Sequence, residues 1–142
     1  MRERIQATII TIGDELLIGQ VIDTNSAFIA QKLNAIGVGV QQRIAVGDDA
    51  KSITNALDTA IQESQIVILT GGLGPTADDI TKPLLNLYFG GKMVVDQASL
   101  DHIKYIFEQI HKRPMIERNL KQAKFLMYVK CCSISQALRL VC

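Results

Sequence analysis

The chain has 142 residues, 48% of them hydrophobic and 20% charged, which favours one folded domain over a disordered chain. Its formal net charge of +1 gives no field strong enough to favour nucleic acid or an anionic membrane as a partner. No apolar run approaches the roughly 20 residues that span a bilayer, and Gly13, Asp14 and Glu15 interrupt the first apolar stretch. We therefore expect a cytoplasmic protein without a signal peptide.

Strand-like and helix-like segments alternate along the chain. Short apolar or β-branched runs predict strands over residues 7–12, 38–46 and 66–69, and an irregular segment follows the first of them. Apolar residues at helical spacing predict helices up to about Ile36, around 53–61, from the early turns at Pro83 to Gly90, and over 97–112. This order predicts an α/β fold, a three-layer α/β/α arrangement with a mostly parallel sheet.

The helix periodicity also predicts which side chains face the core. The inward set comprises Phe28, Ile29, Leu33 and Ile36 in the first helix, Ile53, Ala56, Leu57, Ala60 and Ile61 in the second, and Leu100, Ile103, Phe107 and Ile110 in the last. In the second strand, Val38, Val40, Ile44 and Val46 share a face with Gln42.

Acidic residues follow all three predicted strands. The pairs are Asp14 with Glu15, Asp48 with Asp49, and Asp78 with Asp79. Because the carboxyl ends of parallel strands meet at one edge, where such sheets bind ligands, we expect these carboxylates to converge there.

The third acidic pair belongs to a glycine-rich segment, TGGLGPTADDIT, at residues 70–81. Backbone amides around Gly71, Gly72 and Gly74 are suited to a phosphate, assisted by the positive end of the following helix. The segment lacks the lysine of a P-loop and the spacing of a dinucleotide fingerprint. The alternative is a strand-to-helix turn that needs positive φ.

Several of the acidic residues also have a structural alternative, whereas the charges of Asp14 and Glu15 directly after Gly13 favour a functional role. Asp79 is a candidate ligand for a divalent cation that bridges to a phosphate oxygen, and stabilisation of a helix N-terminus is its alternative, a role that suits Asp78 better. Asp48 has the same ambiguity, with Asp49 as a cap for the next helix. Residues 23–25 are most simply a helix cap, and a ligand role comes second.

Two long motifs together resemble a known family. TIGDELLIGQVIDTNSAFIAQKL and TGGLGPTADDIT, with VGDD and ERNLKQA, are similar to the N-terminal domain of CinA, the competence/damage-inducible protein A. That domain belongs to the molybdopterin-binding superfamily of MoaB, MogA, MoeA and gephyrin. The resemblance runs from about Ala7 to Ala123. Asp78 stands where MogA-type sequences have arginine, and GGLG replaces their GGTG, so CinA is favoured over a molybdopterin adenylyltransferase.

The resemblance implies a metal-dependent cleavage of ADP-ribose-type pyrophosphates with Mg²⁺, Mn²⁺ or Co²⁺. By matching motifs, the implied ligand-binding residues are Gly71, Gly72, Gly74, Thr76, Asp14 and Glu15. The implied metal ligands are Asp14, Asp48 and Asp79, of which Asp48 and Asp79 are also the implied catalytic residues. The alternatives are a pterin- or nucleotide-binding module without turnover and an inactive fragment. The family also implies a homo-oligomer.

The resemblance ends after residue 123. Residues 1–123 are then an incomplete CinA-like domain, and residues 124–142 form a divergent tail that holds all three cysteines, Cys131, Cys132 and Cys142. Their number and spacing fit neither a disulfide framework nor a zinc site. We expect a frameshifted or truncated end, with a genuine divergent tail as the alternative.

Overall fold

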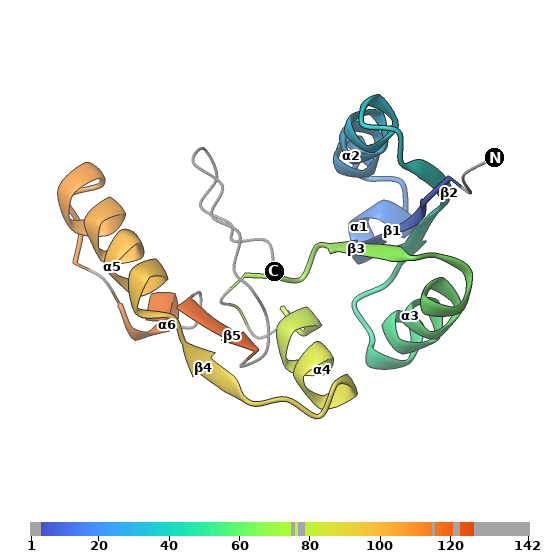
Figure 1. The fold of residues 1–142 in the computed structure, drawn as a ribbon. Coiled ribbons are helices and arrows are strands. Elements are labelled where there is room, and N and C mark those ends of the chain that lie inside the picture. The colour runs from blue at the N-terminus through green and yellow to red at the C-terminus, as the bar shows by residue number, and fades with distance from the viewer. Residues whose placement is uncertain (1–3, 75, 77–78, 115, 121–122, 127–142) are drawn as a thin grey trace. The chain divides into compact units, whose positions relative to one another are not determined.

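Three parallel strands form the centre of the first half of the chain (Figure 1). The computed structural model describes residues 4–74, 76, 79–114, 116–120 and 123–126. It divides into unit 1, Met1–Gly72, and unit 2, Leu73–Cys142, and each unit is described by itself. The predicted tail after residue 126 lies outside the described residues.

The sheet of unit 1 has the order β2-β1-β3. Its strands are β1 (Gln6–Ile12), β2 (Gly39–Val46) and β3 (Ile66–Thr70), and both pairings are parallel. All residues of β1 after Gln6 are buried, as its β-branched, apolar sequence predicts for a central strand. The three predicted strands are therefore confirmed.

Helices α2 (Thr24–Ala35) and α3 (Ala50–Glu63) cover opposite faces of this sheet (Figure 1). The alternation of side chains along β1 shows the same arrangement. Thr11 donates a hydrogen bond to Asp23, the residue before α2, at 2.9 Å. Thr8 points to the other face, where its hydroxyl lies 2.7 Å from that of Ser64, the residue after α3. The helix–sheet–helix layering of the predicted α/β fold is present.

The inward faces of the two helices are only partly as predicted. In α3, Ile53, Leu57 and Ala60 are buried as expected, whereas Ile61 is 46% exposed. Phe28 in α2 and Ile36 directly after it are 60% and 75% exposed, so their assignment to the core is wrong. The buried residue of α2 is Ser26. Successive helical residues turn by about 100°, which puts Phe28 on the side opposite Ser26.

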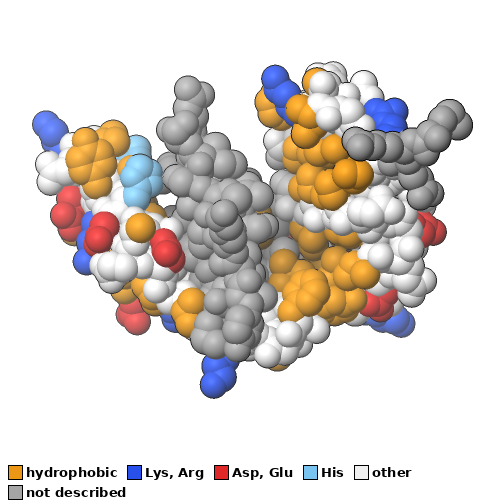
Figure 2. All heavy atoms as spheres, viewed as in Figure 1, with side chains coloured by type: hydrophobic (Ala, Val, Ile, Leu, Met, Phe, Trp, Pro, Cys, Tyr) orange, Lys and Arg blue, Asp and Glu red, His pale blue; other side chains and the backbone are white. Residues whose placement is uncertain are grey.

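The segment predicted as irregular contains a short helix, α1 (Asp14–Leu17). Exposed apolar side chains follow it closely, including Ile18 at 68% and Ile22 at 85% exposed. Figure 2 shows hydrophobic side chains at the surface of the region that holds α1 and α2. The part of the chain that the structure describes holds no helix long and apolar enough to cross a membrane.

Unit 2 combines short helices with a two-stranded antiparallel sheet. Its elements are α4 (Thr81–Tyr88), β4 (Met93–Val95), α5 (Gln97–Tyr105), the π-helix η1 (Ile106–Ile110), α6 (Glu117–Leu120) and β5 (Lys124–Leu126). The helices predicted after the glycine loop and from residue 97 are present, whereas β4, β5 and α6 were not predicted.

The last predicted helix changes its winding halfway. The N–H of His111 donates to the carbonyl of Ile106, a five-residue spacing that marks a π-turn. Ile103, before the π-turn, is buried, whereas Ile110 is 60% exposed. The wider turn shifts the helical phase, and the predicted inward position of Ile110 is therefore wrong.

Candidate functional site

The carboxyl edge of the parallel sheet gathers loops from all three strands of unit 1. Gly13 follows β1, Gly47 follows β2 and Gly71 follows β3. The N–H of Gly13 donates to the carbonyl of Val46 at 3.0 Å, which joins the ends of β1 and β2. From β1 the chain moves to one side of the sheet through α2 and β2, and then to the other side through α3 and β3. The topological switch point therefore lies between β1 and β3, and such points are the usual location of ligand crevices in parallel sheets.

Asp14 and Asp48 hold each other at this edge. The Asp14 Oδ1 accepts a hydrogen bond from the backbone N–H of Asp48 at 3.1 Å. The Asp48 Oδ2 accepts one from the backbone N–H of Asp14 at 3.2 Å. The predicted convergence of the first two acidic loops is thus present, and it is fixed by two charge-assisted hydrogen bonds.

Two buried glycines make room for these carboxylates. A Cβ at Gly47 would lie 2.7 Å from the Oδ1 of Asp14. A Cβ at Gly13 would lie 2.5 Å from the Oε1 of Glu15, whose side chain folds back over the loop. The sequence analysis did not assign a role to Gly47, although its position directly before an acidic pair at a strand end was the available signal.

Gly71 brings the end of β3 against the end of β1. Its φ of 101° lies in the region that favours glycine. A Cβ there would lie 2.0 Å from the carbonyl oxygen of Ile12, a contact that no side chain can make. Gly72, with φ of 59°, continues this turn. The turn therefore needs glycine for positive φ, which confirms the structural alternative and leaves the predicted ligand role open.

Gly74 and Thr76, in the second part of the glycine-rich segment, both contact Asp79. The Asp79 carboxylate accepts hydrogen bonds from the N–H groups of Gly74 and Thr76, both at 2.8 Å, and from the Thr76 hydroxyl. Gly74 and Thr76 are exposed, and Asp79 is half-buried. Asp78 lies outside the described residues, so its predicted role at the start of α4 stays a prediction.

The predicted metal ligands divide between the two units. Asp14 and Asp48 lie together in unit 1, and Asp79 belongs to unit 2. Within the described residues, no group of three or more His, Cys, Asp or Glu side chains is arranged to hold a metal ion. The site of three aspartates therefore stays a prediction, whereas the pairing of Asp14 with Asp48 is a finding.

The alternative roles of two other aspartates are confirmed. Asp49 caps α3 by accepting a hydrogen bond from the N–H of Ser52 at 2.9 Å, so Asp48 is not the cap. Hydrogen bonds from the side chain and backbone of Ser52 lower the pKa of Asp49. Asp23 caps α2 in the same way through the N–H of Ser26 at 2.9 Å.

Asp23 also centres a polar network that the sequence analysis missed. Its carboxylate accepts hydrogen bonds from the hydroxyls of Ser26 and Thr11. Ser26 in turn accepts from the Nε and a terminal nitrogen of Arg43, at 2.9 and 2.6 Å. Partial burial raises the pKa of Asp23, but the hydrogen bonds from Ser26 and Thr11 and the charge of Arg43 outweigh it, so the net pKa is lowered. The network ties α2 to β1 and β2.

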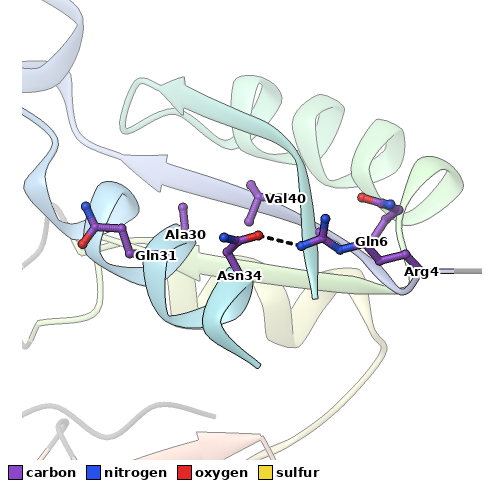
Figure 3. A pocket seen from close by; sticks show the side chains of 7 residues that line it. Arg4, Gln6, Ala30, Gln31, Asn34 and Val40 are labelled. Carbon is purple, nitrogen blue, oxygen red and sulfur yellow. Dashed lines mark hydrogen bonds between the residues drawn. The ribbon is translucent and has the colours of Figure 1, made fainter. Parts of the chain in front are cut away.

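A surface pocket of about 430 Å³ lies at the other end of the sheet, beside the start of β1 and the last turns of α2 (Figure 3). Arg4 lies on its wall and donates to Asn34 Oδ1 at 2.6 Å and to the carbonyl of Gly37 at 3.2 Å. These bonds tie the residues before β1 to the last turn of α2 and to the turn that follows it. None of the predicted site residues lines this pocket.

The sequence is similar to a known domain family and to longer proteins that contain it. Residues 8–134 match the family described as "Probable molybdopterin binding domain". A CinA-like protein of Flavobacterium psychrophilum is 46% identical over 126 residues, which are 89% of this chain and 30% of that protein. A CinA-like protein of Cytophaga hutchinsonii is 47% identical over 123 residues, which are 87% of this chain and 29% of that protein. The chain thus spans less than a third of the length of these curated relatives.

Solved structures share this fold. The protein CinA from Thermoplasma acidophilum superposes with a TM-score of 0.80 at 29% identity, covering 95% of this chain and 78% of that chain. The tungsten cofactor synthesizing protein MoaB from Pyrococcus furiosus superposes with a TM-score of 0.59 at 22% identity, covering 79% of this chain and 68% of that chain. The second likeness concerns the fold alone.

Proposed function

Because the chain belongs to the family of probable molybdopterin-binding domains and is CinA-like, we propose that it binds a phosphate- or pyrophosphate-bearing ligand at the carboxyl edge of its parallel sheet. One observation carries this proposal: the reciprocal hydrogen bonds between Asp14 and Asp48. They hold carboxylates from two separate strand ends side by side at the edge where α/β sheets bind ligands.

This pair of carboxylates suits a divalent cation. Each of the two accepts one hydrogen bond through one oxygen, and among the described residues the Asp14 Oδ2 and the Asp48 Oδ1 have no hydrogen-bond partner. Carboxylate oxygens are the ligands that Mg²⁺ and Mn²⁺ prefer, and Mg²⁺ is usually bound through one or two carboxylates together with phosphate oxygens. When bound, the cation would neutralise phosphate charge. Asp14 and Asp48 would hold it.

The proposed reaction is hydrolysis of ADP-ribose-type nucleotide pyrophosphates. The residues of this chain supply two of its requirements: carboxylates that orient the ligand through a cation, and a glycine turn at Gly71 and Gly72 that lets a ligand approach the backbone. Asp48 would orient an attacking water, because its backbone is held by Asp14 and its Oδ1 has no hydrogen-bond partner among the described residues. Glu15, folded over Gly13, lines the same edge.

The test is the release of AMP from ADP-ribose by the purified chain with Mg²⁺, Mn²⁺ or Co²⁺. Asp48→Asn should reduce the rate by about 10²-fold or more, a typical effect of removing a group that acts on the reacting atoms. Asp101→Asn is the matched control, since Asp101 is an exposed carboxylate of unit 2 that bonds to Gln97. A folded wild-type chain that releases no AMP with any of the three metals contradicts the proposed reaction.

A second candidate is a binding module for a pterin or nucleotide, without turnover. The family description, which names molybdopterin binding, favours it. Saturable binding of a molybdopterin-type ligand or of ADP-ribose, with no product after long incubation, would support this candidate. A broad, non-cooperative thermal transition with dye-accessible apolar surface would instead identify an inactive fragment.

A further inference from the structure

The hydrogen bonds of Asp79 indicate a different role from metal binding, the role that its sequence motif implies. Its Oδ1 accepts from the N–H of Gly74, and its Oδ2 accepts from the N–H and the hydroxyl of Thr76. The N–H of Asp79 donates back to the carbonyl of Thr76 at 3.3 Å. Both carboxylate oxygens therefore accept hydrogen bonds from within the loop.

These contacts also explain why residue 74 is glycine. A Cβ there would lie 2.6 Å from the Oδ2 and 2.9 Å from the Oδ1 of Asp79. The φ of Gly74 is not in the left-handed region, so backbone conformation alone does not require glycine at this position. Glycine is needed because the carboxylate occupies the space that a side chain would fill. Gly74 and Asp79 thus form one fitted pair.

We propose that Asp79 is a positioning residue, which fixes Gly74 and Thr76, and that it does not bind the divalent cation. This inference rests on the proposed function. The two carboxylate oxygens accept three hydrogen bonds from Gly74 and Thr76 and hold these two residues in place, and a cation at those oxygens would compete with these donors. The metal-binding carboxylates are then those of Asp14 and Asp48.

The same contacts change the predicted role of the loop amides. The N–H groups of Gly74 and Thr76 point at Asp79, so a phosphate that bound to them would have to displace its carboxylate. Gly74 and Thr76 therefore act through the arrangement that Asp79 gives them. Thr76 serves as the second partner of Asp79, through its hydroxyl and its N–H, instead of contacting the ligand directly.

The test combines three measurements on the full chain. Amide hydrogen exchange by NMR reports the bonds from Gly74 and Thr76, and calorimetric titrations report Mn²⁺ affinity and the affinity for inorganic pyrophosphate without metal. Asp79→Asn should speed exchange at both amides by about tenfold or more, because charge-assisted bonds are lost. It should weaken pyrophosphate binding and leave Mn²⁺ affinity within about twofold of wild type, since a larger change would mark a lost charge-assisted ligand.

Two further variants keep the result interpretable. Thr76→Val removes only the hydroxyl, so its exchange and pyrophosphate effects should be smaller than those of Asp79→Asn and of the same sign. Asp101→Asn should match wild type in all three measurements. A normal amide spectrum outside the loop shows that each variant is folded.

The opposite pattern overturns the inference. Unchanged exchange at Gly74 and Thr76 together with a large loss of Mn²⁺ affinity in Asp79→Asn would make Asp79 a metal ligand. If the wild-type chain binds neither Mn²⁺ nor pyrophosphate, the proposed function fails, and the role of Asp79 in shaping a ligand loop fails with it. If wild type binds both and exchange is unchanged, the inference about Asp79 alone fails.

Discussion

The backbone N–H of Asp48 donates to the carboxylate of Asp14, and the backbone N–H of Asp14 donates to the carboxylate of Asp48. Each side chain therefore orients the main chain that carries the other. The loops after β1 and β2 behave as one unit, in which a change at either aspartate should be felt at both. Substitution by asparagine or by alanine can separate the effect of the charge from that of the hydrogen bond. Asparagine removes the charge and keeps an acceptor oxygen, whereas alanine removes both.

Asp14→Ala should destabilise the chain by about 0.5–1.5 kcal/mol, the usual net value of one hydrogen bond, and should abolish Mn²⁺ binding at this edge. Asp14→Asn should retain most of the stability and still lose the metal. Urea unfolding and calorimetric titration measure the two effects. Equal destabilisation by alanine and asparagine would show that the charge, and not the hydrogen bond to Asp48, holds the loops together.

Gly47→Ala should cost about 1–3 kcal/mol, because its methyl group would lie 2.7 Å from the Oδ1 of Asp14 and force that side chain away. The matched control is the same substitution made together with Asp14→Ala. There the obstructing carboxylate is absent, and most of the cost of Gly47→Ala should disappear. A cost that persists in the double variant would place the clash elsewhere.

Gly71→Ala should destabilise the chain more than Gly47→Ala or Gly37→Ala. Its Cβ would lie 2.0 Å from the backbone oxygen of Ile12, which cannot move aside as a side chain can. We expect a loss of more than about 3 kcal/mol, or failure to fold. Gly37→Ala is the control: Gly37 also has positive φ, 86°, but nothing lies within 4 Å of a Cβ there. It should cost only about 1 kcal/mol. Thermal unfolding of both variants provides the comparison.

Asp23 should make stability depend on acid pH. Its pKa in the folded chain is below the ordinary value of 3.8, because hydrogen bonds from Ser26 and Thr11 outweigh the effect of burial. The unfolded chain therefore binds more protons in this range, and stability rises with pH. The contribution is present above about pH 3.8 and is lost as the pH falls through the folded pKa.

Urea unfolding of wild type and Asp23→Asn at pH 7 and near pH 3 tests this. The difference in unfolding free energy between the two proteins should be larger at pH 7 than near pH 3. Ser26→Ala should reduce the pH dependence as well, because it removes one of the hydroxyls that stabilise the carboxylate. A constant difference across this range would contradict the assignment to Asp23.

Much of the fold followed from local chemistry. The β-branched run of β1 predicted a buried strand, and the rule that parallel strands end at one edge predicted that Asp14 and Asp48 meet. Asp49 was predicted as a cap because it directly precedes a helix with a strong apolar stripe. Each of these predictions rested on one local effect: the burial of a β-branched strand, the common edge of parallel strand ends, or the capping of a helix.

The errors have equally local causes. Phe28 is exposed because it lies about 200° around the helix from Ser26, which the polar network buries. Ile110 was misplaced because nothing in the apolar pattern announces a π-turn. The contacts of Asp79 depend on the exact path of a glycine-rich loop, which periodicity does not report. The sequence around Gly47 shows only its place before an acidic pair at a strand end, and its role follows from the short distance between a Cβ there and the Oδ1 of Asp14.

In the strand order β2-β1-β3, the strand that precedes the other two in the sequence lies in the middle of the sheet. The backbone N–H of Gln6 donates a hydrogen bond to the side-chain oxygen of Gln65, 59 residues later in the chain. During synthesis, β1 must therefore remain without one of its two neighbours until β3 has emerged from the ribosome. Since sheets built from distant pairings form slowly and expose apolar strands meanwhile, we expect β1 to be the strand of this sheet most open to aggregation while the chain is still growing.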